Sequence, residues 1–438
     1  MYLLSKFGIT KSNYLNLLIF IIPVSFVAGN MIININLILL ILSTIILYGK
    51  EVFKIKYFFL DKLFFTFFFL ILLTGIINDY YFYSNSIPWK PYFDTIVKSI
   101  FFLKYILLYI VLRYLIETNT LNFKYFFASC TLTSIFVSFD IIYQFLNGTD
   151  IFGYEGFKRK LGGPFGDELI AGGYIQRFSI FSFFLIPLFY SSQFGKYLKL
   201  IIPILFIIFF ISIVLSGNRM PLILFLFTVS LIILFQKQTR KYFLPSIILF
   251  ILIFTLLFNF NNKVKNNFIS FYTQISQMVV IVFEKDFSNK KQPQYLKEFS
   301  SFYDTWLLNK YIGGGIKNFR FYCHKRPNID KDSKFICNMH PHNYYLEILT
   351  ETGVVGFFLI IIIFIIILYL TLLKKYFIKS KLNDNKIIIA FIFLFIAEIF
   401  PIKSTGSFFT TGNTTYLFLL IGILIGLARK DILIEKKY

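Results

Sequence analysis

Apolar runs of roughly 18 or more residues recur along the whole 438-residue chain, and each is long enough to cross the hydrocarbon core of a bilayer. Only 15% of the residues are charged and the mean hydropathy is +0.72, whereas soluble domains carry about 25% charged residues. Within lipid, backbone N–H and C=O groups must be paired inside the protein, which favours helices. The sequence therefore predicts an all-α polytopic membrane protein.

The apolar runs predict about twelve transmembrane helices, with one large loop between the ninth and the tenth. No internal repeat or linker divides the chain, so we expect a single membrane domain over residues 1–438 that contains the loop 261–350. The first run lacks a small-residue cleavage site, which predicts a retained helix. The predicted spans are 14–29, 31–48, 59–77, 97–116, 122–146, 170–190, 198–215, 220–236, 242–260, 351–373, 386–402 and 413–428.

Lysine and arginine gather in alternate short loops, and this bias indicates orientation. If the N-terminus is cytoplasmic, every loop that should face the cytoplasm is basic, for example 50–62 and 374–386, while the opposite short loops are poorer. The exception is loop 147–169. We therefore predict that both termini are cytoplasmic and that loop 261–350 lies outside the cytoplasm. These loops also account for the net charge of +22, and no soluble module with a basic stripe and stacking aromatics predicts nucleic-acid binding.

All three histidines lie in the predicted large loop, two of them in the stretch 339–347. His342 precedes a helix that is expected to start near Asn343 and to continue into the tenth span. A neutral imidazole at this place can accept a proton from a hydroxyl group as a general base. The alternative is a capping or interfacial histidine. His340 is the weaker candidate, because it could instead shape the turn before Pro341.

Arginines at membrane boundaries are the second group of candidates. Arg219 lies in the short turn 216–221 between two apolar spans, where a cation is costly and usually marks a ligand or partner. A guanidinium group binds phosphate oxygens bidentately, and pyrophosphate is the anion expected at this depth. Arg177, in the first turns of the sixth span, and Arg320, in the large loop, invite the same interpretation. The alternative is that these side chains snorkel to the headgroups.

The segment 158–168 is a third candidate, because it concentrates cations and glycines before a predicted helix. Lys158, Arg159 and Lys160 could bind an anion at such a helix start. An ordinary glycine-rich surface loop is the alternative, and Asp167 and Glu168 could instead neutralise nearby arginines.

The two loop cysteines, Cys323 and Cys337, precede the histidine motif. Outside the cytoplasm, a disulfide between them is expected to fix the approach to His342. A zinc site is the alternative, since Cys323, His324, Cys337, His340 and His342 all carry zinc-type ligands, but their spacing is not a standard zinc pattern. Cys130 lies within a predicted span and is expected to be a packing residue.

Three motifs carry a resemblance to a known family. The stretch His340-Pro341-His342-Asn343-Tyr344-Tyr345-Leu346-Glu347, followed by Glu351-Thr352-Gly353 and Gly356, resembles the signature of the O-antigen ligase and O-antigen polymerase superfamily. Ser216-Gly217-Asn218-Arg219 is similar to that family's Ser-Gly-Ser-Arg turn. The segment 160–166 is similar to its Arg-x-x-Gly-x-Phe-Gly segment, with Lys160 at the arginine position and Arg159 adjacent. The twelve-span layout also resembles the family, so the likeness covers nearly the full chain.

The resemblance implies a glycosyltransferase of the bacterial inner membrane whose active site faces the periplasm. The donor would be a glycan on undecaprenyl pyrophosphate; a ligase transfers it to the lipid A–core, and a polymerase transfers it to another lipid-linked repeat unit. We favour the ligase. By carry-over, His342 would activate the acceptor hydroxyl and Arg219 would hold the pyrophosphate, without a metal or other cofactor. The expected substrate-binding residues are Arg320, Lys160, Arg159, Arg177, His340 and Asn343.

A transporter with membrane-embedded arginines is the more distant alternative. We find no pair of interrupted helices and no half-to-half symmetry in the sequence that would favour it. Membrane lipids are expected to surround the protein in either case.

Overall fold

The computed structural model describes residues 10–84, 90–157, 160–185, 193–236, 240–284, 293–326, 337, 342–378 and 385–435. These residues form helices joined by loops. Within them, extended pairing is limited to two isolated bridges, Thr149 with Glu155 and Phe157 with Lys160. The prediction of an all-α polytopic membrane protein is confirmed.

Among the described residues, eight helical stretches are long and apolar enough to cross a membrane. Together with three shorter apolar helices, they coincide with every predicted span except the sixth. The sixth span begins with α8 (Ala171–Phe178) and the 3₁₀ turn η3 (Ser179–Phe184), and its last residues, 186–190, lie outside the described residues. The spanning helices are α2 (Lys11–Ala28), α3 (Asn30–Tyr48), α4 (Phe59–Ser84), α5 (Asp94–Phe102) with α6 (Lys104–Glu117), α7 (Phe123–Asn147), α10 (Gln193–Leu215), α11 (Arg219–Phe235), α12 (Phe243–Phe260), α16 (Tyr344–Leu368), α17 (Asn385–Glu398) and α18 (Thr411–Glu435).

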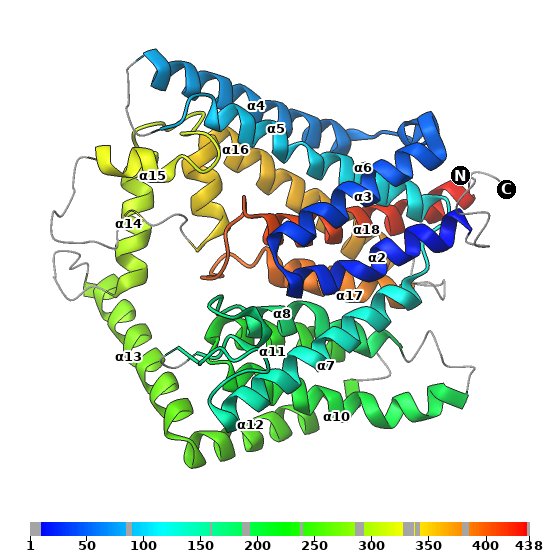
Figure 1. Cartoon of the computed structure of the whole chain (residues 1–438), viewed down its shortest axis with the longest axis vertical. Helices are drawn as coiled ribbons and strands as arrows, with labels where there is room; N and C mark the ends of the chain where they lie inside the picture. The colour runs from blue at the N-terminus through cyan, green and yellow to red at the C-terminus, as the bar shows by residue number, and fades with distance from the viewer. Residues whose placement is uncertain are drawn as a thin grey trace.

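The described residues of the predicted large loop form three further α-helices, α13 (Asn262–Glu284), α14 (Gln294–Trp306) and α15 (Phe319–Tyr322). α13 and α14 run across the ends of the spanning helices, on the left in Figure 1, and α2 begins and α18 ends on the opposite side. The helical pattern expected from Phe268 to Val280 corresponds to α13, and the short helix expected to end near Trp306 corresponds to α14.

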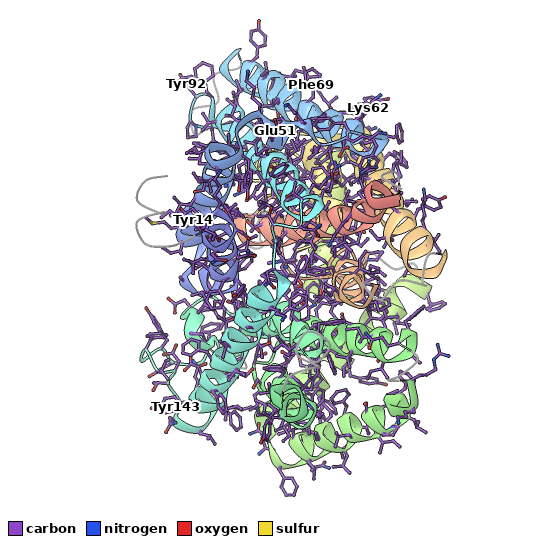
Figure 2. All side chains as sticks on the ribbon, turned by 90° about the vertical axis from the view of Figure 1, so that its right-hand side faces the viewer. Tyr14, Glu51, Lys62, Phe69, Tyr92 and Tyr143 are labelled. Carbon is purple, nitrogen blue, oxygen red and sulfur yellow. A yellow bond between two sulfur atoms is a disulfide. The ribbon has the colours of Figure 1, made fainter. Side chains whose placement is uncertain are left out.

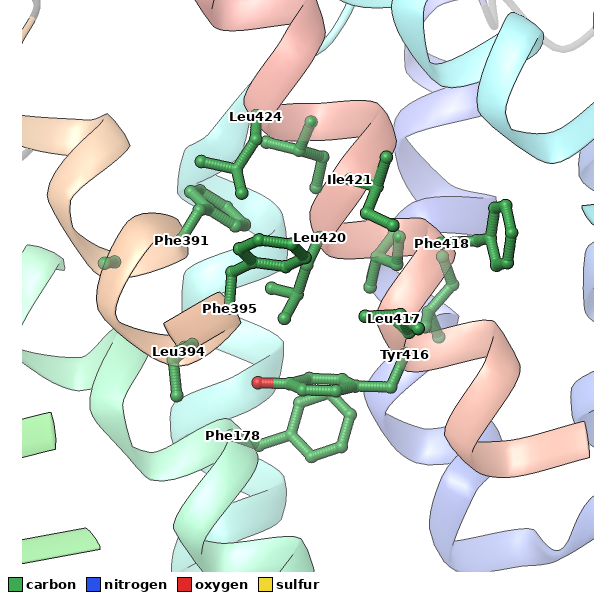
Figure 3. Packing of buried hydrophobic residues seen from close by; sticks show 14 of the residues in the cluster. Phe178, Phe391, Leu394, Phe395, Tyr416, Leu417, Phe418, Leu420, Ile421 and Leu424 are labelled. Atoms are coloured by element: carbon green, nitrogen blue, oxygen red, sulfur yellow. The ribbon is translucent and has the colours of Figure 1, made fainter. Parts of the chain in front are cut away.

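The core of the array is built around α18, most of which is buried. Its Tyr416 packs against Phe178 of α8, whereas Phe418 points to the other side of α18 (Figure 3), where it contacts Phe64 of α4 and Tyr105 of α6. Gly422 and Gly426 let α6 approach closely, because a Cβ atom at either position would lie 2.9 Å from a Cβ atom of Leu112 or Ile116. Small residues four apart are a common device for close helix contact in membranes.

Large apolar side chains also face outward all round the array. Phe69 on α4 is 64% exposed and Tyr143 on α7 is 46% exposed, and Figure 2 shows both at the periphery. None of the residues of α12 is buried. Such an exposed apolar surface fits lipid rather than water.

α16 is interrupted at Gly353, whose φ of 67° and ψ of −172° are not helical. Glycine is required there, because a Cβ atom would lie 2.1 Å from the Tyr311 carbonyl oxygen. The segment 310–315 enters the interruption and pairs with the exposed backbone groups. The bonds run from Gly314 N to Thr350 O (2.9 Å), Gly315 N to Glu351 O (2.8 Å), Val354 N to Lys310 O (2.9 Å) and Val355 N to Tyr311 O (3.2 Å).

The predicted start of the helix near Asn343 is confirmed, because Asn343 is the N-cap of α16, but the prediction that this helix continues uninterrupted into the tenth span is wrong. The two helical turns that follow the histidine motif are separated from the spanning part of α16 by this interruption. Non-helical backbone at a membrane boundary is tolerated where another part of the protein satisfies its polar groups, and the segment 310–315 does so here.

Candidate functional site

A cavity of about 1530 Å³ opens among the helix ends on the side of α13 and α14. Its lining includes four residues selected from the sequence, namely Lys160, Arg177, Arg320 and His342. These residues come from the loop before α8, from α8 itself, from the segment after α14 and from the start of α16. Segments far apart in the chain therefore converge on one space that is large enough for a sizeable ligand.

His342 lies immediately before the N-cap of α16 and lines the cavity. Its φ is +51°, in the left-handed region that only a few per cent of non-glycine residues adopt. Burial lowers the pKa of the His342 imidazole, and the nearby Lys160 lowers it further. A lowered pKa keeps the ring neutral near physiological pH, which is the form that accepts a proton.

Asn343 caps α16, because its Oδ1 accepts hydrogen bonds from Tyr345 N (3.0 Å) and Leu346 N (3.1 Å). Its Nδ2 donates to the carbonyl oxygens of Pro401 (2.9 Å) and Lys403 (3.2 Å). The side chain is buried and is not among the residues that line the cavity. Asn343 thus fixes the backbone next to His342 and does not itself line the cavity.

Among the described residues, five cations line the cavity together with His342, and Lys160, Lys317 and Arg320 are three of them. Arg320 Nε is buried and has no hydrogen-bond partner within the described part of the chain. Burial lowers the pKa of Lys317, although the carboxylates of Glu351 and Glu347 favour its charged form. Lys160 lies near enough to lower the pKa of His342, and Lys317 and Arg320 add positive charge to the same cavity, which suits an anionic ligand.

The guanidinium group of Arg219 forms hydrogen bonds with α13. Its Nε donates to Asn267 Oδ1 (2.8 Å), its Nη2 to the Asn267 carbonyl (2.6 Å) and its Nη1 to Gln274 Oε1 (3.0 Å). Gln274 lines the cavity, and so do the neighbours Asn218 and Pro221, whereas Arg219 is not among the lining residues. The structure therefore places Arg219 in the wall of the cavity.

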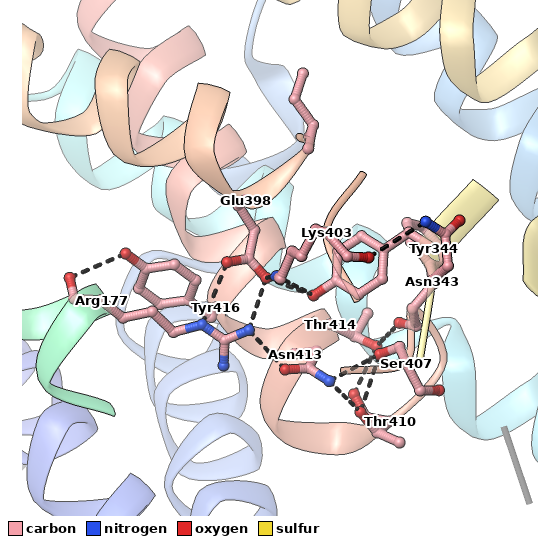
Figure 4. Close-up of polar contacts among 12 residues, drawn as sticks. Arg177, Asn343, Tyr344, Glu398, Lys403, Ser407, Thr410, Asn413, Thr414 and Tyr416 are labelled. Carbon is pink, nitrogen blue, oxygen red and sulfur yellow. Dashed lines mark hydrogen bonds and ion pairs between the residues drawn. The ribbon is translucent and has the colours of Figure 1, made fainter. Parts of the chain in front are cut away.

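Arg177 belongs to a buried network around Glu398 (Figure 4). Glu398 Oε1 accepts from Arg177 Nη2 (2.7 Å), from Lys403 Nζ (2.7 Å) and from the Tyr344 hydroxyl. Arg177 Nη2 also donates to Asn413 Oδ1 (2.6 Å). Burial lowers the pKa of Lys403 to about 8, against the opposing effect of Glu398. We call Arg177, Glu398, Lys403 and Tyr344 the Glu398 network.

Acidic side chains also border the cavity, among them Asp167, Glu168, Glu298 and Glu347. Glu347 is buried and accepts hydrogen bonds from Ser407 Oγ and Phe408 N, both at 2.5 Å. These bonds hold the loop before α18 against the first turn of α16. The cavity therefore has a mixed lining, in which Glu347 lies near enough to Lys317 to interact with it electrostatically.

The sequence reasoning missed Lys317, Lys403, Glu347 and Glu398 as members of this site. Glu398 carried a usable signal, because an ionisable residue within an apolar run is rare and usually functional. Three of the predicted residues, Lys158, Arg159 and His340, lie outside the described residues.

A disulfide joins Cys323 to Cys337, with 5.6 Å between their Cα atoms. Cys323 packs with Phe302 and Phe319, so the bridge ties the approach to the histidine motif to α14 and α15. Among the described residues, no cluster of three or more His, Cys, Asp or Glu side chains could hold a metal ion. Cys130 is a buried free cysteine.

Comparison with protein families gives a match over residues 204–361 to the family described as O-Antigen ligase. Comparison with curated proteins gives no match. The matched segment contains Arg219, Arg320 and His342, but it begins after Lys160 and Arg177 and ends before Glu398. It is narrower than the nearly full-length resemblance drawn from the motifs, and it confirms that resemblance for the part of the chain that carries the histidine motif.

Proposed function

We propose that this bacterial membrane protein, whose residues 204–361 match the O-antigen ligase family, is a ligase that transfers a glycan from undecaprenyl pyrophosphate to a lipid A–core acceptor. The observation that carries the proposal is the shared cavity, in which His342 faces the same space as Lys160, Lys317 and Arg320. A proton acceptor beside a group of cations suits a reaction in which a hydroxyl attacks and a phosphate departs.

In the proposed step, the acceptor hydroxyl loses its proton to the neutral imidazole of His342. The acceptor oxygen forms a bond to the anomeric carbon of the donor sugar, and the bond between that carbon and the pyrophosphate oxygen breaks. The electron pair leaves with the pyrophosphate, which departs as undecaprenyl pyrophosphate. The lowered pKa of His342 supports this role, because the ring is neutral and ready to accept the proton.

Lys160, Lys317 and Arg320 are proposed to stabilise the charge that develops on the pyrophosphate. Fixed cations in a partly dry site stabilise such a charge electrostatically and can take the place of a divalent metal. Arg320 is the best suited of the three, because its guanidinium reaches the cavity with Nε unpaired among the described residues. Arg159 and His340 stay predicted contributors to donor binding.

Arg219 is proposed to contribute to anion binding indirectly, through its contacts with α13. By holding Asn267 and Gln274, Arg219 fixes α13 against the turn before α11. Gln274 then presents its side chain to the cavity. A ligand phosphate that displaced Gln274 from Nη1 would give Arg219 a direct contact as well.

We propose that the cavity faces the periplasm, with both termini in the cytoplasm. The support is the basic character of the loops on the side where α2 begins and α18 ends, opposite α13 and α14. A lipid-linked donor would then reach the cavity from the outer leaflet, with its polar head at the depth of Lys160 and Arg320.

The purified protein in liposomes tests this function with an undecaprenyl-pyrophosphate-linked glycan as donor. Labelled lipid A–core should become glycosylated and undecaprenyl pyrophosphate should be released, with activity retained in EDTA. Longer lipid-linked glycan without labelled lipid A–core would show the polymerase reaction instead. Uptake of an anionic solute without any glycan transfer would contradict an enzymatic function altogether.

A further inference from the structure

Three consecutive residues after His342 are tied to one short segment, 398–403, at the end of α17. Each of the three uses its side chain, and each reaches a different part of that segment. The contacts are Asn343 Nδ2 to the carbonyls of Pro401 (2.9 Å) and Lys403 (3.2 Å), the Tyr344 hydroxyl to Glu398, and the Tyr345 hydroxyl to the Ile399 carbonyl. The start of α16 is therefore anchored almost residue by residue to the end of α17.

Glu398 is the centre of this anchoring. Its carboxylate is buried, with 1% of the residue exposed, and binds both Tyr344 and the Lys403 ammonium group. The Lys403 ammonium also lies 4.5 Å from the centre of the Tyr344 ring. Glu398 therefore contacts the residues after His342 in two ways. It binds the Tyr344 hydroxyl directly, and it binds Lys403, whose carbonyl accepts a hydrogen bond from Asn343.

His342 needs such support because of its backbone. A non-glycine residue at a φ of +51° is in a sparsely populated conformation, which persists only when the surrounding structure holds it. The residues that follow it are held by the contacts just described. The imidazole therefore projects into the cavity from a backbone whose conformation depends on the segment 398–403.

We propose that Glu398 is a positioning residue, which sets the place of the His342 imidazole in the cavity through Tyr344 and Lys403. Glu398 is not among the residues that line the cavity, so it acts through others and does not contact the ligand. The inference rests on the proposed role of His342 as the base. It adds a structural requirement outside the matched segment 204–361.

Tyr344→Phe is the informative variant, because it removes one hydroxyl contact to Glu398 and leaves the pairs with Arg177 and Lys403 in place. Tyr109→Phe is the matched control. The Tyr109 hydroxyl donates to Asp61 Oδ1 (2.6 Å), which also binds Arg113, in a similar buried network away from the cavity. Glu398→Gln tests the carboxylate directly, but it leaves two buried cations without their partner and could prevent folding.

Two measurements are made on protein that is folded in detergent. The first is steady-state glycan transfer, in which Tyr344→Phe should lower kcat by about 10-fold at unchanged KM, since misplacing a catalytic group by about 1 Å can cost about 100-fold. The second is the rate at which diethyl pyrocarbonate modifies His342, followed by mass spectrometry, with the exposed His324 as the internal reference. That rate should change in Tyr344→Phe by at least about 2-fold, and it should stay at the wild-type value in Tyr109→Phe.

The modification rate separates the two proposals, because it does not depend on the reaction catalysed. Absence of glycan transfer by the wild-type protein would overturn the proposed function, and the altered reactivity of His342 would still support the positioning role. A Tyr344→Phe protein with wild-type reactivity at His342 would overturn the positioning role, whatever its turnover. Equal changes in Tyr344→Phe and Tyr109→Phe would overturn it too, because they would show a general loss of rigidity.

Discussion

Two buried ion networks lie near the two ends of α18 and are built from similar parts. The Glu398 network borders the cavity. The other, the Arg113 network, comprises Asp61, Tyr109, Arg113, Glu117 and Arg429, with Arg113 Nη1 2.5 Å from Asp61 Oδ1 and Arg113 Nη2 3.0 Å from Glu117 Oε1. Thr411 and Arg429 are about 27 Å apart along the helix axis, at a rise of 1.5 Å per residue. Each network joins a tyrosine hydroxyl, arginine and a carboxylate.

The two networks differ in charge balance and in surroundings. In the Arg113 network, two arginines face two carboxylates, and none of these residues lines the cavity. In the Glu398 network, Arg177 and Lys403 share the single carboxylate of Glu398, and both cations line the cavity. We expect the balanced network to contribute to stability, and the network with a surplus cation at the cavity to affect turnover as well. The presence of a tyrosine, an arginine and a carboxylate therefore does not by itself reveal the role of a buried ion network; its charge balance and its place relative to the cavity also matter.

The largest expected effect is on the cavity side, at the residue that the Glu398 network supports. His342→Ala should lower turnover by about 10²–10⁴-fold, the usual contribution of a general base. The protein should remain folded, since the imidazole is only partly buried. Glycan transfer and thermal unfolding in detergent are the measurements, with the exposed His324→Ala as the control. Near wild-type turnover in His342→Ala would exclude it as the base.

Breaking the Arg113 network should affect stability without affecting chemistry. Arg113→Met leaves Asp61 and Glu117 as buried carboxylates without their main partner, a change that typically costs about 3–5 kcal/mol. Chemical denaturation in detergent measures the loss, and turnover per folded molecule should match the wild type. Reduced turnover in the folded fraction would contradict the distinction between the two networks.

Arg320→Met tests the cations of the cavity. Loss of a hydrogen bond to a charged group costs about 1.5–3 kcal/mol, so kcat/KM for the lipid-linked donor should fall by roughly 10- to 100-fold. Arg240→Met is the matched control, because Arg240 is exposed and does not line the cavity. If the two variants had the same kcat/KM, Arg320 would have no part in donor recognition.

Gly353→Ala tests the interruption of α16. The residue is held in a conformation that only glycine readily adopts, at a cost of about 1–3 kcal/mol for other residues, and its new Cβ atom would meet the Tyr311 carbonyl. Gly148→Ala is the control, because Gly148 also has a positive φ (89°), but a Cβ atom added there would have nothing within 4 Å. Thermal unfolding should show a larger loss for Gly353→Ala, and equal losses would mean that the segment 310–315 does not depend on close contact there.

The smallest effect is expected in the pH profile. The neutral form of His342 is active, so turnover should rise with pH through its pKa, and the midpoint should lie below 6.5 because burial and Lys160 both lower that pKa. Lys160→Met removes one of these two effects and should move the midpoint upward. The midpoint is read from the profile or from an NMR titration of His342. A downward shift would contradict the assignment.

The transmembrane helices and the approach to the cavity were accessible from the sequence because they depend on local patterns. An apolar run of sufficient length must be helical in lipid, and the predicted spans coincide with the helices wherever the structure describes them completely. The pairing of Cys323 with Cys337 and the place of His342 before a helix are also local, since each concerns residues within a short stretch of chain.

Tertiary structure decided which charged residues share the site, because that depends on contacts between distant segments. Glu398 and Tyr344 are 54 positions apart, and Arg177 and Glu398 are 221 positions apart. The same holds for Arg219. The sequence predicts that Arg219 binds pyrophosphate, and in the fold its guanidinium donates hydrogen bonds to Asn267 of α13. The interruption of α16 is likewise decided by the segment 310–315, since the hydrogen bonds that stabilise it come from outside the helix. Hydropathy and motifs thus determine the helices and the place of His342 before a helix, and the packing of the helices determines the groups that surround this residue.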